Sequence, residues 1–129
     1  MIIDDIYTYL GEQHITGLAA GTSLFKSRQT DTPADQTVIY NTGGLEPDRY
    51  LPTADPTFQI LVRNTNYANG EALVASIVDE LHQKENVQLV ATTGIYFYYI
   101  MLLNEPAHIG RNEKGQHEWS INFVCKVRR

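Results

Sequence analysis

The chain has one cysteine, no long hydrophobic run and no excess of basic residues. Cys125 cannot form a disulfide within the chain, and its apolar neighbours predict a small buried side chain rather than a reactive thiol. The longest apolar run, residues 95–103, is much shorter than the ~20 residues of a transmembrane helix, so we expect no membrane span. The N-terminus lacks the basic and apolar regions of a signal peptide, which predicts that the protein stays in the compartment where it is made.

The charge and composition exclude further classes of protein. A net charge of −5 disfavours a protein that binds DNA or RNA by releasing counterions. With 129 residues, 43% of them hydrophobic and 19% charged, the chain is expected to form one globular domain over residues 1–129.

The residue patterns of enzymes are also missing. No serine has a base placed for it by sequence, and Gly43-Gly44 lacks the lysine and helix of a phosphate loop, so this pair predicts a turn with positive φ. Four histidines lie far apart in the sequence: His14, His82, His108 and His117. No two of them have metal-ligand spacing, although His108 and His117 could approach across a hairpin. We predict no catalytic, cofactor-binding or metal-binding residues and no enzyme activity.

The clearest pattern is a C-terminal hairpin. Residues 117–128 alternate apolar and polar side chains, with Val124 as the single exception, which predicts a strand with one buried face. Residues 95–103 are apolar or aromatic on both faces, and the polar residues 104–116 are expected to connect the two arms. Tyr96, Tyr98 and their neighbours therefore predict either a core on both faces or a contact between subunits.

The remaining elements complete an α+β pattern. Apolar residues at helical spacing predict helices over 2–13 and 67–83, the second becoming regular at Gly70 or Glu71. Strands are expected at 22–26, 37–40, 58–63 and 87–90, with residues 41–44 ending the second and three prolines making 45–56 a rigid loop. The expected fold is α+β, with two helices packed on one face of a mixed, mainly antiparallel sheet that ends in a long β-hairpin.

Four segments together resemble a known family. They are TGGLEP at 42–47 with YLP at 50–52; PTFQILVR at 56–63 with YA at 67–68; LH at 81–82; and EP at 105–106 with IGRNE at 109–113, Gly115 and EWSINF at 118–123. In this order and spacing they resemble the small bacteriophage minor capsid proteins classed as tail terminators. The family pattern has an aspartate where this chain has Asn112.

The resemblance implies a structural protein of the virion rather than an enzyme. It implies a homo-oligomeric ring, expected to be a hexamer, that caps the head-proximal end of a long non-contractile tail tube, stops the tube from polymerising and joins the tail to the head connector. Its partners would be other copies of the chain, the tail tube protein and the connector protein, with assembly in the host cytoplasm and no membrane contact. DNA would pass through the channel without specific binding.

We expect subunit or tube contacts at eight residues: Tyr50, Arg63, Tyr96, Tyr98, Glu105, Arg111, Glu113 and Trp119. The residues at 43–56 are a second candidate subunit patch, and the polar segments 27–36 and 104–116 are candidate contacts with the lumen or the tube. Arg63 lies at the end of an apolar strand, where its charge could instead form a structural ion pair with an acidic side chain. Two other functions stay open, namely another neck component, such as a head-completion or head-tail adaptor protein, and a small metal-dependent enzyme built on His108 and His117.

Overall fold

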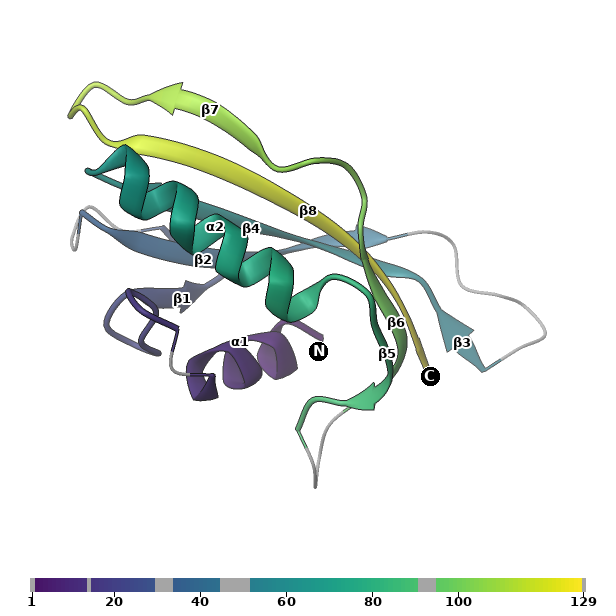
Figure 1. Cartoon of the computed structure of the whole chain (residues 1–129). Helices are drawn as coiled ribbons and strands as arrows, with labels where there is room; N and C mark the ends of the chain where they lie inside the picture. Colours follow the sequence, from purple (N-terminus) through teal and green to yellow (C-terminus); the bar gives the residue numbers. More distant parts are fainter. Residues whose placement is uncertain (1, 14, 30–33, 45–51, 91–94, 129) are drawn as a thin grey trace.

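Two helices lie on one face of a sheet in the computed structural model, which describes residues 2–13, 15–29, 34–44, 52–90 and 95–128 (Figure 1). In these residues the elements are α1 (Ile2–Glu12), β1 (Leu24–Lys26), β2 (Gln36–Gly44), β3 (Thr53–Ala54), β4 (Pro56–Asn64), α2 (Tyr67–Leu81), β5 (Lys84–Gln88), β6 (Tyr96–Leu102), β7 (Ala107–Arg111) and β8 (His117–Arg128). No helix among them is long and apolar enough to cross a membrane.

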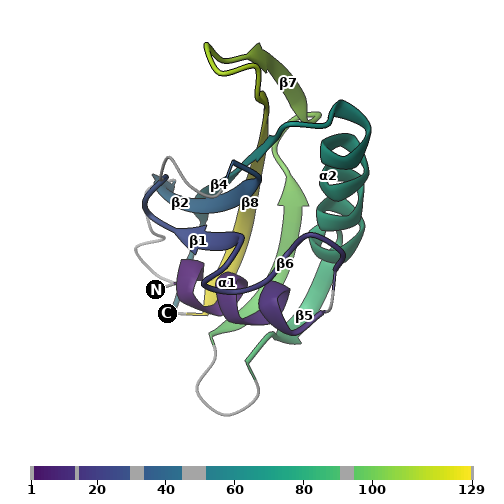
Figure 2. The same cartoon turned by 90° about the vertical axis from the view of Figure 1, so that its left-hand side faces the viewer.

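The sheet is mixed and mainly antiparallel. Its strand order is β1-β2-β4-β8-β6-β5, and only the β1–β2 pair is parallel. The strands β3 and β7 pair with β8 outside this path. Helix α1 packs against β1 and β2, whereas α2 packs against β4, β6 and β8 (Figure 2). This arrangement confirms the predicted fold class.

The core lies between the helices and the inner face of the sheet. The alternation predicted for β8 is confirmed, because Trp119, Ile121, Phe123 and every second residue after them are buried. Phe58 of β4 stacks on Phe123 of β8, with ring centroids 5.0 Å apart and planes at 14°. The apolar stripes of both helices complete this core: Ile3, Ile6 and Leu10 from α1, and Leu73, Val74, Ile77 and Leu81 from α2.

The predicted start of α2 at Tyr67 is confirmed, and the helix is regular from this residue onward instead of from Gly70 or Glu71. The Asn66 side chain caps the helix, because its Oδ1 accepts a hydrogen bond from the Asn69 N–H at 3.1 Å. Gly70 serves packing instead of breaking the helix. A Cβ at this position would lie 2.3 Å from the Trp119 ring, so only glycine lets β8 approach α2 this closely.

The methyl group added by Gly70→Ala would overpack against Trp119, which costs about 1–3 kcal/mol. This cost should exceed the ~1 kcal/mol that alanine gains over glycine in a helix interior, so we expect a net fall in the free energy of unfolding. Chemical denaturation measures the change. Phe at position 119 lacks the two ring atoms that the methyl group would meet, so Gly70→Ala should be neutral or stabilising when Trp119→Phe is also present. A loss of equal size in that background would contradict the packing explanation.

Strand β2 runs through Gly44, although residues 41–44 were expected to end it. The pairing register of β2 and β4 shifts at a bulge between Asn41 and Gly43. Beyond the bulge the two strands continue to pair as far as Gly44 and Pro56. The positive φ predicted for the glycine pair is confirmed, at 89° for Gly43 and 139° for Gly44. The turn assignment is wrong, because the glycines sit in a bulged strand. Residues 45–51 of the proline-rich loop lie outside the described residues, and its remainder includes the short strand β3.

The polar connection at 104–116 also contains a strand. Strand β8 is 12 residues long and pairs with β6 from Phe123 onward. On the same edge of β8, the residues before Phe123 are left to pair with β7. The turn between β7 and β8 is closed by Asn112, whose Oδ1 accepts hydrogen bonds from the N–H groups of Lys114 and Gln116. The asparagine thus supplies the acceptor oxygen that an aspartate would supply there. Strand β5 also begins earlier than predicted, at Lys84 instead of residue 87.

The Cys125 thiol is fully buried, as predicted, and donates to the Pro56 carbonyl at 3.4 Å. Burial, with a smaller effect of the nearby Asp55 charge, raises the pKa of Cys125 to about 12. Near pH 8 only about one thiol in ten thousand would be ionised, so we expect iodoacetamide to leave the native protein unlabelled. The denatured protein should be labelled fully, as mass spectrometry would detect. Rapid labelling of the native chain would mean that β8 opens or is not buried.

Candidate interaction surfaces

Both helices of the described residues pack on the inner face of the sheet, and neither of them covers the outer face. Its side chains come from alternate positions of the central strands, such as Gln59 and Leu61 of β4, Asn122 and Val124 of β8, and Met101 of β6. These residues are half-buried in the single chain. The face is mixed in polarity, and its apolar and aromatic part, around Met101 and Val124, is a natural place for contact with another molecule.

The tyrosine patch lies on this face and consists of Tyr96, Tyr98, Tyr99, Met101, Val124 and Arg128. A bulge between Phe97 and Tyr99 breaks the alternation of β6, so that Phe97 and Ile100 enter the core while both Tyr98 and Tyr99 stay outside it. Tyr98 and Tyr99 line an open hollow of about 510 Å³ with Met101, Val124 and Glu85. The bulge explains why the aromatic arm showed no alternation in sequence.

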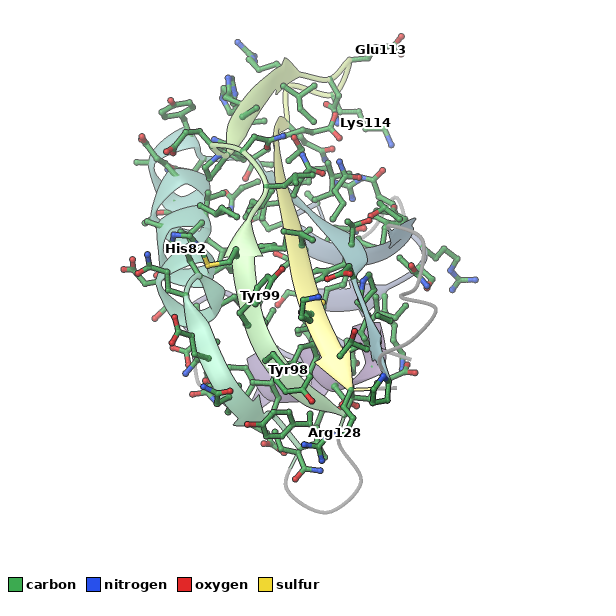
Figure 3. All side chains as sticks on the ribbon, turned by 90° about the vertical axis from the view of Figure 1, so that its right-hand side faces the viewer. His82, Tyr98, Tyr99, Glu113, Lys114 and Arg128 are labelled. Carbon is green, nitrogen blue, oxygen red and sulfur yellow. The ribbon has the colours of Figure 1, made fainter. Side chains whose placement is uncertain are left out.

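Arg128 organises the edge of the patch. Its guanidinium carbon lies 4.9 Å from the Tyr96 ring centroid and 6.0 Å from that of Tyr98, and its Nε donates to the Tyr98 hydroxyl at 3.5 Å. The two tyrosine rings meet edge to face, with centroids 5.2 Å apart. Figure 3 shows Tyr98, Tyr99 and Arg128 toward the same end of the sheet. The patch therefore combines aromatic area with a positive charge.

A second surface, the α2–β7 groove, lies at the other end of β8. It is a groove of about 390 Å³ between α2 and the segment that leads into β7. Its apolar lining includes Val74, Val78, Leu102 and Trp119. Its charged lining is acidic and comes from Glu71, Asp79 and Glu105.

The two hairpin histidines meet beside this groove, as the sequence allowed. His108 Nε2 and His117 Nδ1 are 3.1 Å apart, and Tyr67 meets both rings edge to face with centroids 5.2 and 5.3 Å away. Desolvation, followed by the charges of His108 and Arg111, lowers the pKa of His117. A neutral His117 fits the short contact, because two imidazolium rings would repel each other. Among the described residues, no three side chains of histidine, cysteine, aspartate or glutamate form a metal-binding group.

The structure separates the predicted contact residues. Tyr96 and Tyr98 lie at one end of β8, while Glu105, Arg111 and Glu113 are exposed at the other end. Arg63 and Trp119 are buried, Trp119 at the wall of the α2–β7 groove, and Arg63 Nε donates to the Ala34 carbonyl at 2.9 Å. Tyr50 lies outside the described residues. Sequence reasoning missed Tyr67 and Arg128, because only the fold brings them to these surfaces.

A family model described as bacteriophage tail terminator protein matches residues 3–129. The chain belongs to this family. The match covers nearly the whole chain and confirms the resemblance carried by the four sequence segments. The protein is therefore a structural, tail-related component of a phage virion.

A solved structure has the same fold. A chain from a structure titled virion of native gene transfer agent (GTA) particle superposes with a TM-score of 0.70 at 15% sequence identity. The alignment covers 96% of this chain and 92% of the other chain. A search of curated protein sequences gave no match. At this low identity, the likeness establishes a shared fold and leaves the contact residues to be argued from this chain.

Proposed function

We propose that the chain forms a closed ring, a hexamer, that caps the head-proximal end of the tail tube, stops its polymerisation and joins the tail to the head connector. Membership of the tail terminator family supports the placement in the tail. The observation that carries self-assembly is the tyrosine patch on the sheet face opposite to the two described helices. Tyrosine and arginine are enriched at protein interfaces because they bury much area and keep polar tips.

The charge of the chain suits a ring around DNA. Its net charge of −5 repels the phosphate backbone, so DNA passes through the lumen without being held. The tail tube protein and the head-tail connector protein are the other partners in this proposal, and assembly takes place in the host cytoplasm. The exposed strand β7 and its turn, within the segment 104–116, are candidates for these contacts.

Electron microscopy of particles made without this chain tests the proposal. Tails should become much longer than normal and variable in length, because nothing ends tube growth, and they should stay unattached to heads. Complementation with the wild-type chain should restore both features. Free tails of normal length would contradict termination and would favour a head-completion or adaptor role.

A further inference from the structure

We propose that neighbouring copies in the ring meet by placing the tyrosine patch of one copy against the α2–β7 groove of the next. The inference rests on the proposed ring and names the two surfaces that build it. A contact between two different patches is heterologous, and repeated contacts of this kind close into a ring when the rotation permits.

The groove end of the molecule carries unusual apolar exposure. Among the described residues, the large hydrophobic side chains with high exposure are Tyr67, Leu103 and Ile109, at 45%, 57% and 61%. Tyr67 is the first residue of α2 and lines the groove, Leu103 directly follows β6, and Ile109 belongs to β7. Strand β7 is also a free sheet edge, since β8 is its strand partner in the described part of the chain. A partner would cover both features.

The groove has an acidic lining, whereas the patch carries Arg128 at its edge and Glu85 beside its hollow. Glu71, Asp79 and Glu105 line the groove, and no lysine or arginine is among the described lining residues. The patch presents Arg128, whose described partners are two rings and a phenol oxygen and include no carboxylate. An arginine beside two tyrosines thus matches an apolar groove with an acidic lining.

The two surfaces are far enough apart to serve two neighbours at once. They lie on opposite faces of the sheet, the groove beside α2 and the patch on the outer face, and Arg128 of the patch and Trp119 of the groove are near opposite ends of β8. Figure 3 places Tyr98 and Arg128 at one end of the molecule and Glu113 and Lys114, in the β7–β8 turn, at the other. Each copy can therefore donate its patch to one neighbour and its groove to the other.

A charge-reversal pair tests this contact in the full-length chain. Arg128→Glu and Glu105→Arg should each weaken self-association by about tenfold or more, measured by sedimentation velocity at low salt, because each brings like charges together. The double variant should recover most of the wild-type association. Glu12→Arg is the matched control, since it reverses an exposed acid at the end of α1, outside both surfaces, and should leave association unchanged.

The outcomes separate the two proposals. Single variants with no effect, or a double variant as weak as the two losses combined, would overturn the patch-to-groove contact. A wild-type chain that stays monomeric up to about 1 mM would overturn it too, because the contact would then be worth less than about 4 kcal/mol. Overlong tails in particles that lack the chain would still support termination in either case, so the ring contact can fail while the proposed function stands.

Discussion

Replacing Phe58 with alanine is expected to lower the free energy of unfolding by about 3–5 kcal/mol. The ring of Phe58, the third residue of β4, is fully buried and stacks on Phe123 of β8. Its removal would leave a cavity between the two strands that join the halves of the sheet. Urea denaturation followed by circular dichroism measures the loss, and the variant should be the most damaging single truncation considered for this chain.

Phe25→Ala is the matched control for this truncation. Phe25 is only half-buried and belongs to the three-residue edge strand β1, so the same truncation there should cost much less. Equal losses at the two positions, or a loss below about 1 kcal/mol at Phe58, would contradict the described core.

Replacing Tyr98 with aspartate is expected to abolish oligomers while the fold is retained. Tyr98 lies outside the core in the bulge of β6, so a carboxylate there remains solvated in the monomer. In an assembled interface the same carboxylate would be desolvated beside apolar groups, which is unfavourable. In addition, loss of a central interface tyrosine commonly weakens the binding free energy by about 2 kcal/mol or more, about a 30-fold loss of affinity. Size-exclusion chromatography with light scattering measures the mass, and circular dichroism checks the fold.

Thr8→Asp adds the same charge on the exposed surface of α1 and should leave the oligomer unchanged. Two results would contradict the interface. Unfolding of Tyr98→Asp would place the ring in the core, and an unchanged oligomer mass would mean that this face stays free in the assembly.

Most of the fold could be predicted because its strongest elements have local periodicity. Strand β8 alternates over its whole length, and the apolar stripe of α2 follows helical spacing around Leu73, Val74 and Ile77. The errors arose where a distant residue decides the local structure. Gly70 looks like a helix breaker until Trp119 is placed against it, and Gly44 looks like a strand end until β4 pairs beside it. Strand β7 was hidden because its residues are exposed at a sheet edge and show no alternation.

The candidate surfaces were predictable only in part, for a similar reason. An excess of tyrosines in one arm predicted either a core on both faces or a contact face, because too many aromatic rings compete for one side of a small sheet. Arg128 and Tyr96 are far apart in the sequence, so their contact depends on the antiparallel pairing of β6 and β8. The α2–β7 groove also needs residues from separate elements, such as Val74 and Trp119, which no sequence motif joins.

The length of phage tails tests most directly whether self-assembly through the tyrosine patch ends tail growth. A phage that lacks this chain would be complemented with the wild-type chain, Thr8→Asp or Tyr98→Asp, and tail lengths would be measured by electron microscopy. The wild-type chain and Thr8→Asp should give tails of one length joined to heads, and Tyr98→Asp should give overlong tails without heads. Tails of normal length with a folded Tyr98→Asp chain would contradict the account.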